Sequence, residues 1–269
     1  MVRAFRQSRL TAAGIFAASV VLTVLVWIRD RGLPVHIPLI ASVLMLLLGV
    51  FAGQLAARLV ADSCNTKLLG LLHVELDPDA FLRQYAAIPG RLKPDSREYL
   101  VSSAYLADGY AAKGDFDAAL AALSPLERAG LAGDAALRGL YLQDLCAYRL
   151  GKEDRPGAAQ ALEELERLIA GCGEKQARLA QNLSDCAALL RARLICLKGR
   201  AVDRAWLERQ LWQAPFRLRR LDIQQILAQD ALRRLGPEQA APLLARLRDE
   251  GGKTWYAAWA REQLGQPGK

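Results

Sequence analysis

Histidine and methionine are nearly absent from this chain, which has two of each among its 269 residues. Neither His36 nor His73 has a Ser, Cys or acidic residue at a recognisable catalytic spacing. The glycines stand singly and form no phosphate-binding loop. We therefore expect no enzyme activity, no cofactor and no metal ion.

The cysteines also lack a functional pattern. The chain has five, an odd number, and none of them belongs to a CxxC pair. A disulfide framework favours an even number, whereas free cysteine is a common small buried residue. We expect reduced thiols, as in the cytosol. The positions are Cys64, Cys146, Cys172, Cys186 and Cys196.

Charge is almost missing from the first part of the chain. Only four residues between 10 and 61 are charged: Arg29, Asp30, Arg31 and Arg58. The uncharged runs 11–28 and 37–57 are close to the ~20 apolar residues with which a helix crosses a bilayer. Gly32 and Pro34 between the runs favour a chain reversal. The sequence predicts a two-helix transmembrane hairpin, and the absence of Lys, Asp and Glu inside it argues against an ion pathway.

A cleaved signal peptide is the competing interpretation of the first run. It is disfavoured because Trp27, Ile28 and Arg29 follow where small residues would mark a cleavage site. A second apolar run follows as well, which suits a hairpin.

Basic residues near the hairpin predict its orientation. Five lie on the outer ends: Arg3, Arg6, Arg9, Arg58 and Lys67. Only Arg29 and Arg31 lie in the loop. By the positive-inside rule, we expect a protein of a bacterial cell membrane with two spans and both termini cytosolic.

Small residues form a stripe in the second run. Gly49, Gly53 and Ala57 repeat at intervals of four, which lets helix backbones approach closely. The stripe is consistent with packing inside the hairpin or with dimerisation, and also with the general abundance of glycine and alanine in membrane helices. The oligomeric state stays open.

The rest of the chain has the pattern of amphipathic helices without strand-like alternation. A helix is expected to begin at Asp77 and Pro78, as an N-cap followed by proline. We divide the chain into a tail and hairpin at 1–62, a connector at 63–75 and a helical-repeat domain at 76–269. The expected fold class is all-α.

Four turns suggest internal repetition within residues 76–269. Each has a glycine that is expected to end the preceding helix in the left-handed conformation. The glycines are Gly114, Gly151, Gly199 and Gly236. Each turn joins a longer helix to a shorter one, which predicts helix–turn–helix units stacked as an α-solenoid.

The first unit resembles a tetratricopeptide repeat (TPR). Its matching positions are Leu106, Ala107, Tyr110, Gly114, Phe116 and Ala119. The resemblance covers about 25 residues well and implies a curved scaffold that binds proteins. The family's clamp for peptide carboxylates uses basic and Asn residues on the inner face. By alignment, that face here presents Val101, Ala104, Asp108 and Ala111, which departs from the clamp.

Two further clusters have open interpretations. Arg217, Arg219 and Arg220 could contact anionic lipid or an acidic partner, or form an ordinary solvated face. Trp255, Tyr256 and Trp259 could form a ligand platform, although packing on the end of the solenoid is the simpler interpretation. Basic residues are otherwise interspersed with acidic ones, which argues against nucleic-acid binding.

The sequence predicts a membrane-anchored TPR-like scaffold or adaptor that binds a protein partner at the cytosolic face of the membrane. The alternative is an accessory subunit of a membrane enzyme or secretion complex, with the hairpin as its main interface. The sequence does not identify the partner.

Overall fold

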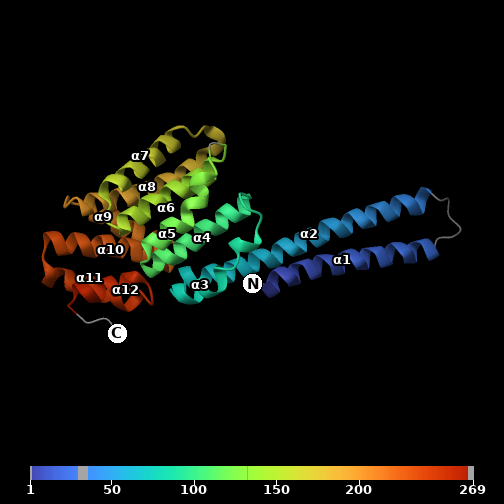
Figure 1. The fold of residues 1–269 in the computed structure, drawn as a ribbon, viewed down its shortest axis with the longest axis horizontal. Helices are drawn as coiled ribbons and strands as arrows, with labels where there is room; N and C mark the ends of the chain where they lie inside the picture. The colour runs from blue at the N-terminus through green and yellow to red at the C-terminus, as the bar shows by residue number, and fades with distance from the viewer. Residues whose placement is uncertain (1, 30–35, 132, 266–269) are drawn as a thin grey trace. The chain divides into compact units, whose positions relative to one another are not determined.

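The computed structural model describes residues 2–29, 36–131 and 133–265. All regular structure in these residues is helical, which confirms the predicted all-α class for the described part of the chain. The chain forms two compact units, Met1–Leu68 and Leu69–Lys269 (Figure 1).

The first unit consists of α1 (Val2–Arg29) and most of α2 (His36–His73). Within α1, Leu10–Ile28 is long and apolar enough to cross a membrane, with a mean hydropathy of 2.2. It is the one such helix in the described residues, and Ser42–Ala57 in α2 forms a shorter apolar stretch. The chain reversal expected between the two runs falls on residues 30–35, which lie outside the described residues.

Side chains of α1 and α2 contact each other within this unit. Trp27 Nε1 donates a hydrogen bond of 2.6 Å to Ser42 Oγ. A Cβ atom at Gly49 would overlap the Ser19 side chain, and one at Gly53 would lie 3.2 Å from a carbonyl oxygen of α1. The absence of side chains at these two glycines therefore lets α2 approach α1 closely.

The second unit begins at Leu69, inside α2. The segment expected as a connector, 63–75, is helical as far as His73. Short 3₁₀ turns lie at Pro89–Arg91 and Glu174–Gln176. The α-helices that follow α2 are α3 (Pro78–Tyr85), α4 (Arg97–Lys113), α5 (Phe116–Arg128), α6 (Ala135–Gly151), α7 (Arg155–Ala170), α8 (Ala177–Leu197), α9 (Arg204–Gln213), α10 (Arg217–Arg234), α11 (Pro237–Glu250) and α12 (Trp255–Gln263).

Aspartate side chains define where many of these helices begin. Each accepts a hydrogen bond from a backbone N–H in the first turn, which satisfies a donor that has no partner within the helix. The residues that act in this way are Asp77, Asp115, Asp134, Asp154 and Asp203. Asp77 thus caps α3 where the sequence predicted a helix start, with Pro78 at the first helical position.

The expected left-handed glycines occur at three of the four turns. Gly114, Gly199 and Gly236 have φ of 92°, 71° and 95°. The expectation is wrong for Gly151, because the left-handed residue of that turn is Glu153, with φ of 60°. Gly151 is needed for space instead, since a Cβ atom there would overlap the ring of Phe116.

Helices pack in consecutive pairs, α4 with α5, α6 with α7, and α10 with α11. α9 packs on α10, and residues of α8, α9 and α10 share one apolar cluster. The first helices of the pairs also contact one another in the order α4, α6, α8, α10. One face of each first helix is therefore turned toward the interior of the second unit.

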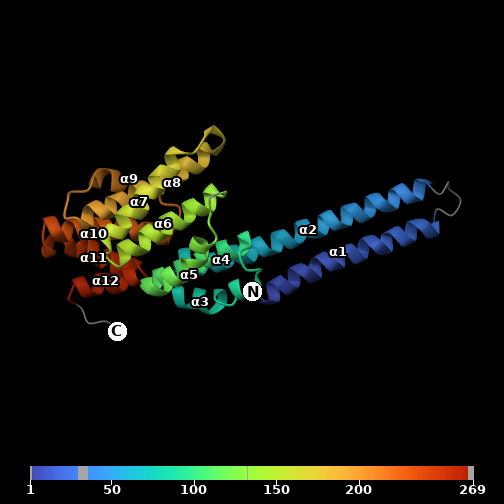
Figure 2. The same cartoon turned by 45° about the horizontal axis from the view of Figure 1, so that its top comes forward.

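The array closes on itself. α12 contacts both α10 and α4, so helices from the beginning and the end of the second unit meet (Figures 1 and 2). The short segment before α3 reinforces this closure, because Leu76 is fully buried among residues of α10, α11 and α12. Its carbonyl oxygen accepts a hydrogen bond of 3.1 Å from the backbone of Lys253. As a result, the inner faces of the first helices surround a pocket.

We predict that Ala119→Phe destabilises the protein by roughly 1–3 kcal/mol, because Ala119 is fully buried where α5 packs against α4. Ala121→Phe is the matched control, since Ala121 lies on the same helix and is exposed. Urea unfolding of the full-length protein in detergent, followed by circular dichroism, measures both changes. Equal stability of the two variants would contradict the packing of α5 described here.

Candidate functional site: a polar pocket

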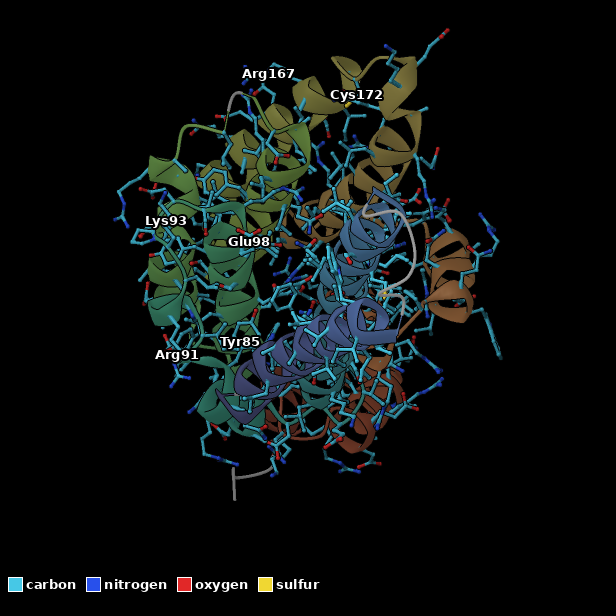
Figure 3. The ribbon with its side chains drawn as sticks, turned by 90° about the vertical axis from the view of Figure 1, so that its right-hand side faces the viewer. Tyr85, Arg91, Lys93, Glu98, Arg167 and Cys172 are labelled. Atoms are coloured by element: carbon cyan, nitrogen blue, oxygen red, sulfur yellow. The ribbon has the colours of Figure 1, made fainter. Side chains whose placement is uncertain are left out.

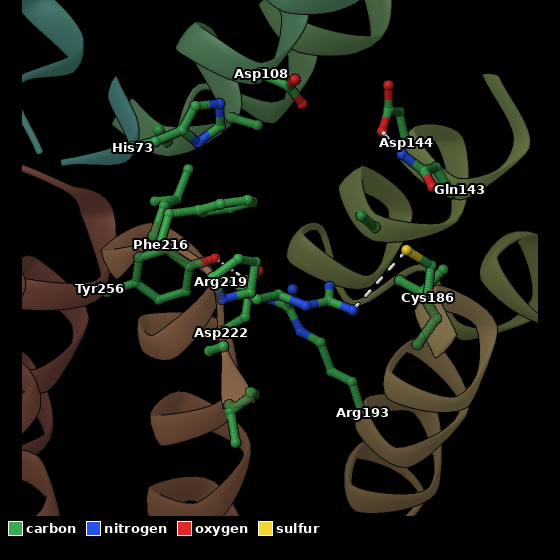
Figure 4. Close-up of a pocket in the computed structure, with 18 of the residues that line it drawn as sticks. His73, Asp108, Gln143, Asp144, Cys186, Arg193, Phe216, Arg219, Asp222 and Tyr256 are labelled. Atoms are coloured by element: carbon green, nitrogen blue, oxygen red, sulfur yellow. Dashed lines mark hydrogen bonds between the residues drawn. The ribbon is translucent and has the colours of Figure 1, made fainter. Parts of the chain in front are cut away.

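The strongest candidate site is a pocket of about 730 Å³ in the second unit. Side chains from α4, α6, α8, α10 and α12, and from the end of α2, line it (Figure 4). Charged residues line it from four of these helices: Asp108 from α4, Asp144 from α6, Asp185 and Arg193 from α8, and Arg219 and Asp222 from α10. This concentration of charge is unusual for the interior of a helical domain.

Asp108 and Asp144 form a carboxyl pair on neighbouring first helices. Asp108 Oδ1 accepts a hydrogen bond of 2.8 Å from the hydroxyl of Tyr148. Asp144 Oδ1 accepts a longer one, 3.3 Å, from Gln143 Nε2, while its Oδ2 is buried without a hydrogen-bond partner. In the described residues, neither carboxyl group forms an ion pair.

Burial makes both carboxyl groups hard to ionise. It raises the pKa of Asp108 to about 6, and the hydrogen bond from Tyr148 opposes this increase. Burial also raises the pKa of Asp144 well above its usual value, and the nearby charge of Asp108 raises it further. The pair therefore retains a proton into the neutral pH range.

The basic residues of the pocket are also without acidic partners. Arg193 is 9% exposed, and its Nε has no hydrogen-bond partner. Its guanidinium group lies 5.5 Å from the centre of the Trp255 ring, a favourable cation–π contact. Arg219 Nη2 lies 3.9 Å from Cys186 Sγ. No ion pair in the described part of the chain involves either arginine.

The remaining wall of the pocket combines aromatic and polar groups. The hydroxyl of Tyr256 donates a short hydrogen bond to Asp222. The ring of His73 lies 4.7 Å from that of Phe216. Burial lowers the pKa of His73 despite the opposing charge of Asp222, so this imidazole is neutral near pH 7.

A second hollow, of about 280 Å³, lies beside Arg167 and Cys172, which sit at one end of the second unit (Figure 3). None of its lining residues has a buried side-chain polar atom without a hydrogen-bond partner. Its chemistry is that of an ordinary surface depression, and the larger pocket is the better candidate.

Of the six residues of the predicted repeat signature, only Phe116 lines the pocket, and the others serve the packing of α4 and α5. Ala107 and Ala119 are fully buried between α4 and α5. The others are Leu106 and Tyr110, which are half-buried, Gly114, which ends α4, and Phe116, which packs edge-on against Trp255 at 5.5 Å. Of the four positions assigned to the inner face, Asp108 and Ala111 line the pocket, whereas Val101 and Ala104 do not.

The three predicted contact arginines have separate environments. Arg217 donates hydrogen bonds to the carbonyl oxygens of Val74 and Glu250. Arg219 lines the pocket, and Arg220 is half-buried with an Nε that has no partner. Of the three, only Arg219 reaches the pocket.

The other predicted clusters are placed as follows. Trp255 and Tyr256 line the pocket, while Trp259 packs on the apolar cluster of α10–α12. In the small-residue stripe, Gly49 and Gly53 are buried and Ala57 is half-buried.

Sequence reasoning missed Asp144 and Arg193 as pocket residues, although a signal was present. A charged residue stands six or seven positions before each turn glycine: Asp108, Asp144, Arg193 and Asp230. The first three line the pocket, and Asp230 is buried within α10. A charge at a repeated position on the first helix of each unit marks the face that these helices share.

Comparisons with protein-family models, curated proteins and solved structures give no match. An all-α fold does not by itself imply a function, which depends on the chemistry of the site. The pocket offers carboxyl, guanidinium and phenol groups that lack full partners, beside aromatic side chains. Such a surface suits the binding of a polar or charged ligand.

The raised pKa of Asp108 predicts a pH-dependent effect of its replacement. The folded state disfavours ionisation, so the contribution of Asp108 to stability is fully present below pH ~4 and is lost as pH rises through about 6. We expect Asp108→Asn to stabilise the protein by roughly 1–3 kcal/mol at pH 7.5 and to have little effect at pH 4.

Urea unfolding of the full-length protein at both pH values measures this difference. Asp95→Asn is the control, since Asp95 is exposed and its left-handed backbone is one that asparagine tolerates. A stability difference that is independent of pH would contradict the raised pKa of Asp108.

Proposed function

We propose that this protein is a membrane-anchored, TPR-like adaptor that binds a segment of a protein partner in the pocket of its second unit. The observation that carries the proposal is the pocket itself. Its walls are the inner faces of successive helix pairs, and they present polar groups without partners. Helical-repeat proteins bind their partners with the surface that their first helices share.

The surface of the first unit supports membrane anchoring. Large apolar side chains are exposed on both long helices, among them Leu25 at 54%, Leu48 at 65% and Phe51 at 68%. Exposed apolar surface on this scale is costly in water and favourable in lipid. Trp27 of α1 donates a hydrogen bond to Ser42 of α2, and Gly49 of α2 lies close to Ser19 of α1. Both contacts support two helices packed as a transmembrane hairpin.

The positions of basic residues and cysteines support a cytosolic second unit. The positive-inside rule favours cytosolic termini, because Arg3, Arg6 and Arg9 precede the first apolar run. The described residues of the second unit include four free cysteines: Cys146, Cys172, Cys186 and Cys196. Free thiols persist in a reducing compartment.

The accessory-subunit hypothesis places the main interface on the hairpin. Gly49 and Gly53 are turned toward α1, so the small-residue stripe is already used within the first unit. A partner of the hairpin would have to use its other faces, which carry large apolar side chains suited to lipid. This distribution favours the adaptor.

Site-specific photo-crosslinking in intact membranes tests the adaptor. We expect a photoreactive residue at Asn182, an exposed position on the pocket rim, to form a discrete protein adduct. Glu163 on α7 is exposed and lies outside the pocket lining, so it should form none. Adducts at Leu48 in the hairpin, without any at Asn182, would support the accessory subunit instead.

Thiol labelling tests the topology. We expect a single cysteine introduced by Ala121→Cys, at an exposed position of α5, to react with a membrane-impermeant reagent only after permeabilisation. A cysteine at Gly32, between the two apolar runs, should react in sealed cells. Reaction of the Ala121→Cys variant in sealed cells would place the second unit outside and remove the case for cytosolic partners.

A further inference from the structure

The pocket has more acidic than basic groups. Four carboxyl groups line it, against two guanidinium groups: Asp108, Asp144, Asp185 and Asp222, with Arg193 and Arg219. The buried imidazole of His73 does not compensate, since it is neutral near pH 7. Even when Asp108 and Asp144 together retain one proton, three carboxylates face two guanidinium groups, so the pocket is complementary to a ligand with positive charge.

One carboxyl oxygen of Asp144, Oδ2, lacks a partner in either protonation state. It is 6% exposed, and its Oδ2 is buried without a hydrogen bond. As a carboxylate, that oxygen would need a donor, and as an acid it would need an acceptor. A buried polar atom without a partner is costly, and a hydrogen bond to a ligand would relieve that cost.

Arg193 gives an independent observation of the same kind. Its side chain is more than nine-tenths buried, it lines the same pocket, and its Nε has no partner (Figure 4). The protein thus keeps opposite charges in one pocket without pairing them. Charges that are not paired with each other remain free to interact with a ligand.

We propose that the carboxyl pair Asp108–Asp144 binds a cationic nitrogen, an ammonium or guanidinium group, that the ligand inserts into the pocket. The proposal rests on the proposed function in so far as a partner protein supplies this group from a lysine or arginine side chain. A small aliphatic amine has the same chemistry and is the other possible source.

The local chemistry favours an organic cation over a metal ion. An ammonium group has three donors, and Asp108, Gln143 and Asp144 bring several acceptor oxygens to the pocket lining. In the described residues, no group of three or more His, Cys, Asp and Glu side chains is placed to hold a metal. Aromatic walls from Phe116 and Trp255 suit the methylene stem of a lysine.

Calorimetric titration of the full-length protein in detergent tests the proposal with defined probes. The probes are N-acetyl-lysine amide, its uncharged analogue N-acetyl-norleucine amide, 1,4-diaminobutane and magnesium chloride at constant ionic strength. We expect saturable binding of the lysine amide, about tenfold or more tighter than that of the norleucine amide.

Two variants locate the binding point. Asp144→Asn and Asp108→Asn should each weaken binding of the lysine amide about tenfold or more, because each replaces one carboxyl group of the pair with an uncharged amide of similar shape. Asp95→Asn should leave binding unchanged, since Asp95 is exposed and lies outside the pocket lining. Circular dichroism of each variant verifies its fold.

The outcomes separate this inference from the adaptor function. Preferential binding of 1,4-diaminobutane, with no protein adduct at Asn182, would support the cation site and overturn the adaptor. Equal binding of the two amides, unchanged binding by Asp144→Asn, or displacement of the lysine amide by magnesium would overturn the cation site. The absence of saturable binding of the lysine amide up to tens of millimolar would also overturn the cation site. In that case, a protein adduct at Asn182 would still support the adaptor.

Discussion

The packing of Trp255 against the first helix pair is the contact on which the second unit depends. Trp255 lies edge-on to Phe116, and a Cβ atom at Gly114 would lie 2.9 Å from the Trp255 Cβ. Glycine is therefore required at position 114 both for its left-handed backbone and for this close approach. Because Trp255 begins α12, its contact joins the end of the helical array to its beginning and encloses the pocket.

Enclosure changes the energetics of the polar groups on the inner faces. On an open concave surface, Asp144 and Arg193 would be solvated, whereas in the closed array both are nearly buried and incompletely partnered. Trp255 partly compensates Arg193 through its ring face. The carboxyl pair has no such compensation beyond single hydrogen bonds from Tyr148 and Gln143. Under the proposed function, this cost in stability accompanies the placement of polar groups for a ligand.

Much of the fold is readable from local signals in the sequence. Asp77 and Pro78 predicted the start of α3, and Gly114 predicted the end of α4, because caps and left-handed turns depend on neighbouring residues alone. Gly151 was misinterpreted because its cause is distant in sequence. The ring of Phe116 occupies the space that a side chain at position 151 would need.

The candidate site was harder to predict for the same reason. Arg193 lies on the face of α8 that carries its polar residues, and helical periodicity identifies such a face without saying whether it meets water or another helix. The closure by α12 decides that question, and it depends on contacts between residues more than 100 positions apart. Asp108 was placed on the inner face by the repeat resemblance, but its neighbour Asp144 becomes apparent only when α4 and α6 are side by side.

Under the proposed function, modest affinity of the pocket is compatible with anchoring of the protein in a membrane. A single buried cation contact supplies limited affinity, because desolvation of both charges offsets much of their attraction. In the proposed function, anchoring holds the pocket at the membrane surface and raises its local concentration there, so that modest affinity is sufficient for association with a partner at that surface. In this proposal the pocket supplies selectivity, since an uncharged segment would leave Asp144 Oδ2 without a partner while a lysine or arginine would satisfy it. Anchoring by α1 and recognition by the carboxyl pair would thus contribute separately, the first to the extent of binding and the second to the choice of ligand.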